Sequence, residues 1–383
     1  MGLSSGESVD AGHCLVACGA DDPRAAQARI RPRCGRGFVA GLIFALLAGQ
    51  VSAQDIRIAT FAAPLGRKGP GLLLRDLGRA DDQIDAVAAI VAQVAPDILL
   101  LTDVDYDRDG LAMQALADRM GFAHSFALLP NAGRATGLDL DGNGRVGEAR
   151  DAQGYGLFSG DSGMALLSRW PINADAVQDL SPLLWRDLPW ATLPNGQVWT
   201  DEIANIQRLS TTGHWIVPVQ TPDGPVTAMA FSATPPVFDG PEDRNELRNR
   251  DELLLWAHAL DGDFGPSPQD YVIAGNANLD PVDGDGRRDA MARMLADPRL
   301  TDPLPRSSGG LAAADTDHSG DPALDTADWP DGAPGNLRVS YVLPAATWTV
   351  TGSGVFWPPP DDPNAKIAEA AGPHRLVWVD LRR

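Results

Sequence analysis

The stretch "YVIAGNANLDPVDGDG", from Tyr271 to Gly286, joins a short apolar strand to a polar turn. The strand ends near Gly275, and Asn276 and Asn278 follow at its mouth. In α/β proteins, ligands and catalytic groups gather at such strand ends. Asparagine is neutral there, so it cannot act as a general base and is a weak ligand for a divalent metal. The stretch predicts an α/β protein whose key strand end is chemically unusual.

Strands and helices alternate on both sides of this stretch. Apolar residues at helical spacing predict helices over residues 81–95, 109–121, 241–260 and 287–296. Asp81 or Asp82 would cap the first helix, and Pro96 would end it. Strands are expected over residues 56–63, 97–101, 162–168, 271–274, 337–344 and 375–381, with a hairpin over 214–232 that turns at 222–224. Hairpins among helices indicate mixed sheets with helices outside.

Proline and glycine concentrate in residues 130–160, 302–336 and 353–373. These segments are expected to be long surface loops inside one domain.

The charge of the chain is strongly acidic. Its 383 residues carry a formal net charge of −20, and residues 54–383 alone hold 26 basic and 47 acidic side chains. Non-specific nucleic-acid binding depends on basic surface, so nucleic acid is not an expected partner. The composition, with 44% hydrophobic residues, is that of a globular protein with a sizeable core. The acidity itself has a simple explanation in solubility.

The first 53 residues have the pattern of a targeting leader. A basic region that includes Arg29 and Arg36 precedes the apolar run Phe38–Gly49, and "VSA" ends at Ala53. This order predicts a signal peptide cleaved near Ala53 and a mature domain over residues 54–383. We therefore expect a periplasmic or secreted bacterial protein. Contact with a membrane would arise only through an uncleaved leader.

All three cysteines, Cys14, Cys18 and Cys34, lie in this leader. The mature chain would then have no disulfide, thiol nucleophile or thiolate zinc site.

Five stretches in order resemble the endonuclease/exonuclease/phosphatase superfamily. They are "RIATFAA", "DILLLTDVDYD", "GMALLSRWPI", "VIAGNANLDP", and "LRVSYVLP" with "GPHRLVWVDL". The loop "ATPPVFDGPEDRNELRNRDE" (Ala233–Glu252) is similar to that of a secreted bacterial subgroup. The resemblance implies a four-layer α/β/β/α sandwich, in which two mixed β-sheets pack face to face with helices outside. It also implies metal-dependent hydrolysis of phosphoesters.

Most positions at which that family carries catalytic or metal-binding side chains hold other residues here. By this resemblance, the first strand has lost its Asn at Ala62, and the middle strand has lost its His at Ser232. The water-activating Asp has become Asn276. The Asp that orients the terminal histidine is Ser340, and a metal-binding Asp is Pro373.

Three of the family positions keep a related or identical residue. The metal-binding Glu is Asp103, still a carboxylate but one methylene shorter. Asn278 and the terminal His374 are unchanged. One short carboxylate and amides are a poor site for Mg²⁺, and His374 lacks the aspartate that would support its charged form.

These substitutions predict a pseudoenzyme that binds an unknown ligand or protein partner. The alternative is an active, divergent phosphodiesterase or phosphatase that uses Mg²⁺ or Mn²⁺. Its metal site would be rebuilt from carboxylates at shifted positions, such as Asp105, Asp239, Asp280 or Asp283. A second alternative is a calcium-dependent structural protein.

The retained residues also have ordinary structural explanations. His374 would be a hydrogen-bonded strand-end residue, Asp103 part of a solvated acidic loop, and Asn278 a turn-former. Tyr341 and Trp378 are expected in the core.

The loop "DLDGNGRVGEARD" (Asp139–Asp151) starts like a calcium-binding EF-hand loop. Asp139, Asp141 and Asn143 have the expected spacing, but Arg150 stands where the bidentate Glu belongs. Glu148 or Asp151 would have to substitute, and the bound Ca²⁺ would be structural. Residues 315–321 and 283–286 are weaker copies of the pattern.

Overall fold

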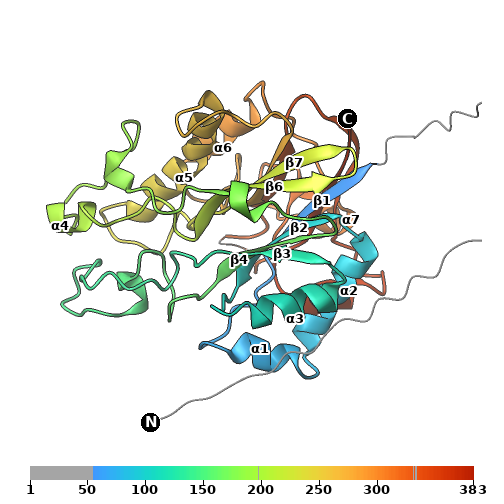
Figure 1. Ribbon diagram of the computed structural model, residues 1–383, viewed down its shortest axis with the longest axis horizontal. Helices are drawn as coiled ribbons and strands as arrows, with labels where there is room; N and C mark the ends of the chain where they lie inside the picture. Colours follow the sequence, from blue (N-terminus) through green and yellow to red (C-terminus); the bar gives the residue numbers. More distant parts are fainter. Residues whose placement is uncertain (1–54, 197, 331, 333) are drawn as a thin grey trace, which may run out of the picture. The chain divides into compact units, whose positions relative to one another are not determined.

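The computed structural model describes residues 55–383 except positions 197, 331 and 333. Two β-sheets pack face to face in this part of the chain, and helices cover their outer faces (Figure 1). Both sheets contain parallel and antiparallel pairs. The mixed, four-layer arrangement expected from the sequence is therefore confirmed.

The first sheet has six strands in the order β10-β11-β1-β2-β4-β3. They are β1 (Ile56–Phe61), β2 (Ile98–Val104), β3 (His124–Phe126), β4 (Gly163–Ser168), β10 (Thr349–Val355) and β11 (Val377–Arg382). Strand β4, "GMALLS", is buried along its whole length. Its continuous apolar run fits a strand that is covered on both faces.

The second sheet has five strands in the order β5-β6-β7-β8-β9. They are β5 (Gln178–Asp179), β6 (Gly213–Thr221), β7 (Gly224–Ser232), β8 (Tyr271–Asn276) and β9 (Ser340–Pro344). The hairpin of β6 and β7 turns where expected.

The helices are α1 (Leu72–Leu77), α2 (Asp82–Val94), α3 (Leu111–Met120), α4 (Asp201–Ala204), α5 (Arg244–Asp261), α6 (Arg288–Leu295), α7 (Ser308–Ala312) and α8 (Ala365–Ala371). Short 3-10 turns cover Ala149–Asp151, Ala174–Ala176, Trp185–Asp187 and Pro322–Leu324. Each helix within the described residues is too short or too polar to cross a membrane.

Local sequence signals set the helix ends. The Asp81 carboxylate caps α2 by accepting hydrogen bonds from Gln83 N–H and Ile84 N–H. Gly121 ends α3 in the left-handed conformation. Helix α5 starts at Arg244 and not at Pro241, because Asp243 adopts a left-handed φ of 56° and separates the proline from the helix. Helices α7 and α8 lie inside segments expected to be loops, so those expectations were wrong there. Strand β10 was not expected, and only its end falls within residues 353–373.

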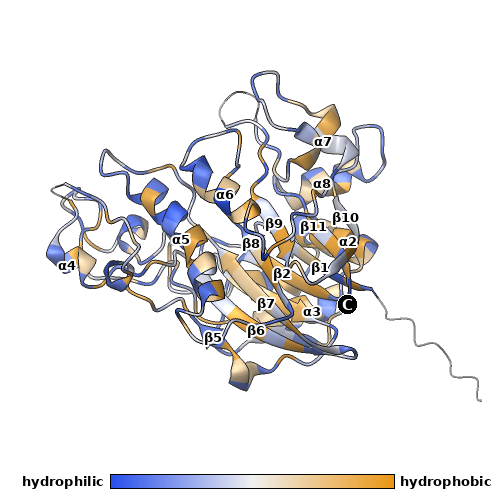
Figure 2. Cartoon of the chain, turned by 90° about the horizontal axis from the view of Figure 1, so that it is seen from above, coloured by the Kyte–Doolittle hydropathy of each residue, from blue (hydrophilic) through white to orange (hydrophobic). Residues whose placement is uncertain are grey.

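Alternate residues of the strands pack into two different apolar layers. Ile98 and Leu100 of β2 face the second sheet, whereas Leu99 and Leu101 pack against α2 and α3. Figure 2 shows the apolar strands surrounded by polar loops and helix faces. Because β1, β2, β7, β8 and β9 pack in this way, their ends bring the candidate site residues to one region of the domain.

Candidate functional site

Three candidate residues stand in register across neighbouring strands of the second sheet. Ser232 at the end of β7 pairs with Asn276 at the end of β8, and Asn276 pairs with Ser340 at the start of β9. All three are buried. Main-chain hydrogen bonds continue past the strand ends, from Ala233 N–H to Asn276 O and from Ala277 N–H to Val339 O. The motifs that contain these residues thus meet where strands β7, β8 and β9 end or begin, at one end of the second sheet.

The two asparagines of the turn bond to each other. Asn276 Oδ1 accepts from Asn278 N–H at 3.1 Å, and Asn276 Nδ2 donates to Asn278 Oδ1 at 3.1 Å. Asn278 has a left-handed φ of 50°, and its side chain also donates to Ala233 O. The expectation that Asn278 forms a turn is confirmed. Both amides satisfy the protein's own polar groups here.

Gly275 lets β7 and β8 approach closely before this turn. A Cβ at Gly275 would lie 2.1 Å from the main-chain oxygen of Phe231. Only glycine fits at this position without a shift of the backbone.

His374 and Ser340 are attached to a common segment. Thr326 Oγ1 accepts from Ser340 N–H at 3.0 Å, and Ala327 pairs with His374 through the main chain. Yet His374 Nδ1 and Ser340 Oγ are both buried without a hydrogen-bond partner in the described part of the chain. Burial and the nearby charge of Arg375 lower the pKa of His374 to about 4. The expectation of a hydrogen-bonded histidine side chain is wrong at Nδ1.

Two further candidate positions, Ala62 and Pro373, carry no side-chain polar group. Ala62 is buried behind the end of β1. Pro373 contributes its carbonyl oxygen, which accepts from Asp328 N–H at 2.9 Å. The Trp329 ring meets His374 edge-on, with ring centroids 5.2 Å apart. The hydroxyls of Thr60 and Thr102, near the ends of β1 and β2, are also buried and lack a partner among the described residues.

Asp103 lies in a second acidic group at the end of β2. Its φ of 62° is left-handed and coincides with an irregularity in the pairing of β2 with β4. Burial raises the pKa of Asp103, and a hydrogen bond from Ser162 opposes that shift. Burial, with a smaller contribution from the charge of Asp161, raises the pKa of Asp105 to about 6. Asp103 is therefore not part of a solvated loop, as one explanation required.

The hydrogen bonds of this acidic group run to its own loops. Asp105 accepts from Arg67 N–H at 2.9 Å, and Ser162 Oγ donates to Asp161 at 2.9 Å. Within the described residues, no hydrogen bond joins Asp103 to Asn276 or His374. The hydrogen bonds of the candidate residues therefore form two separate networks, one of amides and one of carboxylates.

The core expectation for Tyr341 is confirmed. It is buried and donates to Leu279 O and Arg338 O at 3.0 and 2.6 Å. Trp378 is only partly buried, with the Arg57 guanidinium 4.1 Å above its ring.

A buried polar network beneath the turn was not anticipated from the sequence. Asn249 Nδ2 donates to Thr234 O at 2.6 Å and to Ala277 O at 2.8 Å, so one side chain joins the ends of β7 and β8. Glu252 accepts from Thr211 N–H and Thr234 N–H, and burial raises its pKa to about 7. Both residues lie within "RNELRNRDE". The signal in the sequence that could have revealed this network is the presence of polar residues on the inner face of helix α5.

The calcium-like loop gathers three carboxylates. Oxygens of Asp139, Asp141 and Asp151 lie within 4.8 Å of one another. Asp151 thus provides the third carboxylate, one of the two substitutes considered. Asn143 instead donates to Glu148 at 2.7 Å and to Asp141 at 3.1 Å.

The two weaker acidic loops meet each other. Asp283 accepts from Ser319 N–H at 2.9 Å and from Gly320 N–H at 2.7 Å. Asp325 lies near both loops, and burial together with the charges of Asp280 and Asp283 raises its pKa to about 8.

The residues at the neutral strand ends do not fit a divalent metal. A cation such as Mg²⁺ requires several oxygen ligands with negative charge. The only described group of three acidic residues with converging oxygens is Asp139, Asp141 and Asp151, in a different loop. The amide oxygen of Asn276 is already engaged by Asn278.

Comparisons with known proteins agree with the fold. The profile of the Endonuclease/Exonuclease/phosphatase family matches residues 66–374. An endonuclease/exonuclease/phosphatase from Beutenbergia cavernae superposes with a TM-score of 0.50 and 18% identity, over 86% of this chain and 72% of that one. No curated protein shows a significant match.

Two further solved structures have lower TM-scores. Sphingomyelinase C from Streptomyces griseocarneus has a TM-score of 0.47 and 15% identity, over 85% of this chain and 99% of that one. A 3′ phosphatase from Neisseria bound to a DNA hairpin has a TM-score of 0.48 and 16% identity, over 86% of this chain and 100% of that one. At these identities the likeness concerns the fold alone.

Proposed function

The chain belongs to the endonuclease/exonuclease/phosphatase family, and from this premise we propose that it is an exported member with a disarmed active site. It would bind a ligand or a protein partner instead of hydrolysing a phosphoester. The chemistry of the family needs a metal, a base and a supported histidine. Asn276, Ser340 and Pro373 offer none of the carboxylates expected at their positions.

The observation that carries this proposal is the state of Ser340 and His374. Ser340 Oγ and His374 Nδ1 are buried and lack a hydrogen-bond partner among residues 55–383, apart from the three undescribed positions. A histidine that works as an acid or as an electrostatic stabiliser needs a fixed tautomer and a favourable charged form. Burial without a carboxylate partner disfavours the charged form of His374 and lowers its pKa to about 4.

The test is hydrolysis of a generic phosphodiester with Mg²⁺ or Mn²⁺, with His374→Ala as the matched control. Loss of a single acid–base residue typically costs about 10²–10⁴ in rate, and several are replaced here. We expect no metal-dependent turnover above background. Turnover that disappears in His374→Ala would refute the proposal.

A second candidate is an active, divergent phosphodiesterase or phosphatase. It is favoured by the acidic group of Asp103, Asp105 and Asp161, in which two carboxyl groups have raised pKa values. Perturbed carboxyl groups gather at functional sites. In that case Asp105→Asn would abolish turnover in the same assay.

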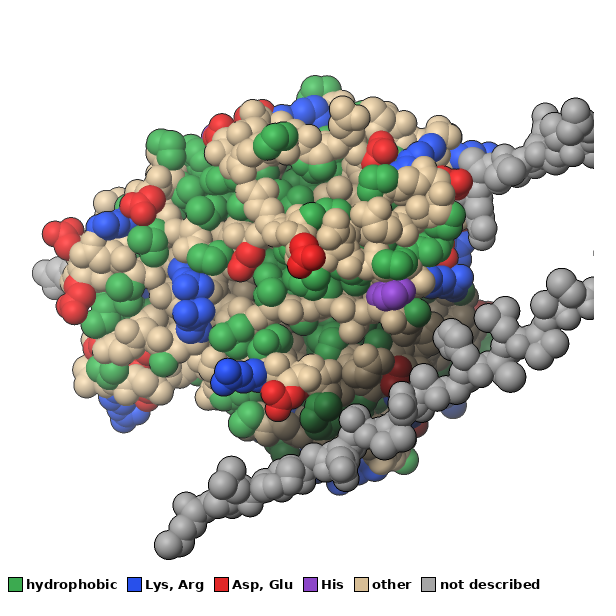
Figure 3. Space-filling view, viewed as in Figure 1, with side chains coloured by type: hydrophobic (Ala, Val, Ile, Leu, Met, Phe, Trp, Pro, Cys, Tyr) green, Lys and Arg blue, Asp and Glu red, His purple; other side chains and the backbone are tan. Residues whose placement is uncertain are grey.

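Export and the class of partner follow from charge and the leader pattern. The basic and apolar order of residues 29–53 supports cleavage near Ala53. On the face in Figure 3, Lys and Arg side chains are scattered among hydrophobic and acidic ones. This distribution supports a partner other than nucleic acid.

Calcium is the cofactor that we propose, with a structural role. Asp139, Asp141 and Asp151 would hold it in the loop between β3 and β4. Hard oxygen ligands at this spacing suit Ca²⁺. The third candidate function, a calcium-dependent structural protein, depends on this loop alone.

A further inference from the structure

A small, mostly apolar cavity lies between helices α5 and α6, next to strand β8. Figure 2 shows the two helices beside the strands of the second sheet. The volume of the cavity is about 160 Å³. An apolar cavity of about 150 Å³ holds one benzene molecule, so the space is large enough for a small ring. The cavity is separate from the strand ends, because neither Asn276 nor Ser340 lines it.

The spacing of side chains on the two helices creates this space. Leu253, Trp256 and Leu260 line the cavity from one face of α5, where residues three, four and seven apart lie together. Ala290 and Met294, four residues apart on α6, line it from the other side. All five residues are buried. Because Ala290 carries only a methyl group where α6 meets α5, a space remains between the longer side chains.

One wall of the cavity contains a polar atom without a partner. Trp256 is 1% exposed, yet its Nε1–H has no hydrogen-bond partner among the described residues. Its ring is held in place, because Phe231 meets it edge-on at 5.8 Å between ring centroids and His214 lies 5.1 Å away. Both ring nitrogens of His214 are themselves engaged, with Ser210 Oγ and with Glu252 O. Buried indole N–H groups usually have an acceptor, so this one indicates a ligand that supplies it.

The charged side chains that line the cavity are already paired. Arg293 forms an ion pair with Asp289, and Asp297 forms one with Arg299 at 2.6 Å. Among the lining residues, Trp256 Nε1 is the only buried side-chain polar atom in the described structure without a partner. A buried water needs about two to four polar partners, so water is a poor occupant. An uncharged molecule with a single acceptor fits this wall better.

We infer that the cavity binds one uncharged monocyclic molecule of about six to eight non-hydrogen atoms, whose single acceptor pairs with Trp256 Nε1–H. An aromatic ring suits the lining, because the indole of Trp256 and the thioether of Met294 both make favourable contacts with aromatic rings. This inference goes beyond the proposed function and does not depend on it, since the strand-end residues take no part in the cavity.

The test is an NMR titration of the isotope-labelled, full-length protein with benzonitrile, which has one ring and one acceptor. Phenylacetylene is the ligand control, because it has nearly the same shape and carries a C–H group in place of the nitrile nitrogen. Trp256→Phe identifies the indole resonance and removes the donor.

The variants of α6 test the location of the ligand. Ala290→Leu fills the cavity, whereas Ala292→Leu places the same side chain on the exposed face of the same helix. Ala257→Leu on α5 is a second filling variant, which replaces Ala290→Leu if that protein does not fold. Thermal melting followed by circular dichroism checks that each variant is folded.

We expect benzonitrile to bind about five- to tenfold more tightly than phenylacetylene, and the indole proton of Trp256 to shift downfield with benzonitrile alone. Trp256→Phe should abolish this preference. A filling substitution should weaken the binding of both ligands at least about tenfold, and Ala292→Leu should leave it unchanged. The inference would be overturned by an absence of saturable binding, by equal affinity for the two ligands, or by undiminished binding in a folded Ala290→Leu or Ala257→Leu protein.

Discussion

The main chains of His374 and Ser340 both bind the segment Thr326–Ala327, yet His374 Nδ1 and Ser340 Oγ have no hydrogen-bond partner among the described residues. An unpaired polar atom in the interior costs about 1–3 kcal/mol. The proposed function explains these two atoms as the positions of an acid–base pair without the carboxylate that would join them.

Ser340→Asp should give His374 a charged partner and raise its pKa from about 4 by at least about one unit. The measurement is an NMR titration of the imidazole, with the resonance assigned by His374→Gln. Ser340→Asn is the control, because it has nearly the same shape as aspartate and no charge. If the pKa of His374 is the same in both variants, the two side chains do not meet.

Asp325→Asn should stabilise the protein at pH 8 and have little effect at pH 4. The folded-state pKa of Asp325 is about 8, above its ordinary value of 3.8. Between these values the folded state binds more protons than the unfolded state, so stability falls as the pH rises. We expect a gain on the order of 2 kcal/mol at pH 8, measured by urea unfolding.

The control for this prediction is Asp317→Asn, which changes an exposed carboxylate in the adjacent loop. It should leave the pH dependence unchanged. A gain for Asp325→Asn that is equal at pH 4 and pH 8 would show that charge repulsion is not its cause.

Asn249→Asp should destabilise the fold by about 3–5 kcal/mol. The substitution removes the donor that joins Thr234 O to Ala277 O and leaves a buried carboxylate facing two carbonyl oxygens. Urea unfolding measures the effect, and the exposed Asn205→Asp is the matched control. A loss below about 1 kcal/mol would mean that Asn249 does not hold the two strand ends together.

Calcium should raise the melting temperature through the loop Asp139–Asp151. A ligand at a hundred times its dissociation constant stabilises the folded state by about 2.7 kcal/mol. Asp141→Asn should reduce this shift, whereas Asp175→Asn should keep it. A calcium-dependent shift that survives in Asp141→Asn would place the ion elsewhere, and no shift in the unsubstituted protein would remove calcium from the proposal.

The sequence by itself determined the sandwich and the identity of the strand ends. Residues Ile84, Val87 and Val94 at helical spacing fixed α2, and Gly121 fixed the end of α3, because these signals act over a few residues. The position of Asn276 at a strand end was also readable, since its apolar strand precedes it directly.

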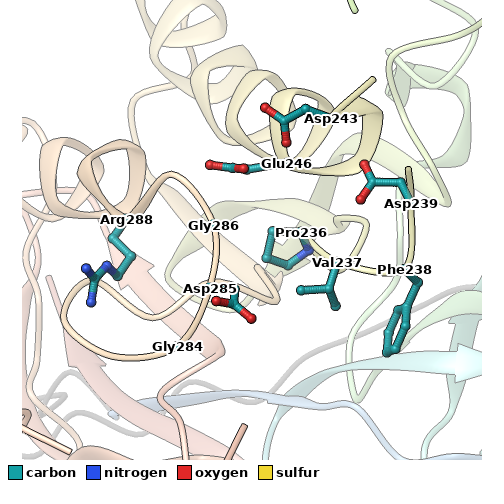
Figure 4. A pocket seen from close by; sticks show the side chains of 10 residues that line it. All are labelled: Pro236, Val237, Phe238, Asp239, Asp243, Glu246, Gly284, Asp285, Gly286 and Arg288. Atoms are coloured by element: carbon teal, nitrogen blue, oxygen red, sulfur yellow. The ribbon is translucent and has the colours of Figure 1, made fainter. Parts of the chain in front are cut away.

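Only the tertiary structure decided what surrounds those strand ends. Asn249 reaches Ala277 across 28 positions of sequence. Asp285, in the loop before α6, faces Glu246 of helix α5 (Figure 4). No local pattern encodes such distances, because hydrogen bonding, burial and charge depend on which segments the fold brings together. His374 is a further example. The sequence shows that a histidine stands at this position, but only the packed domain shows that its Nδ1 has no partner among the described residues.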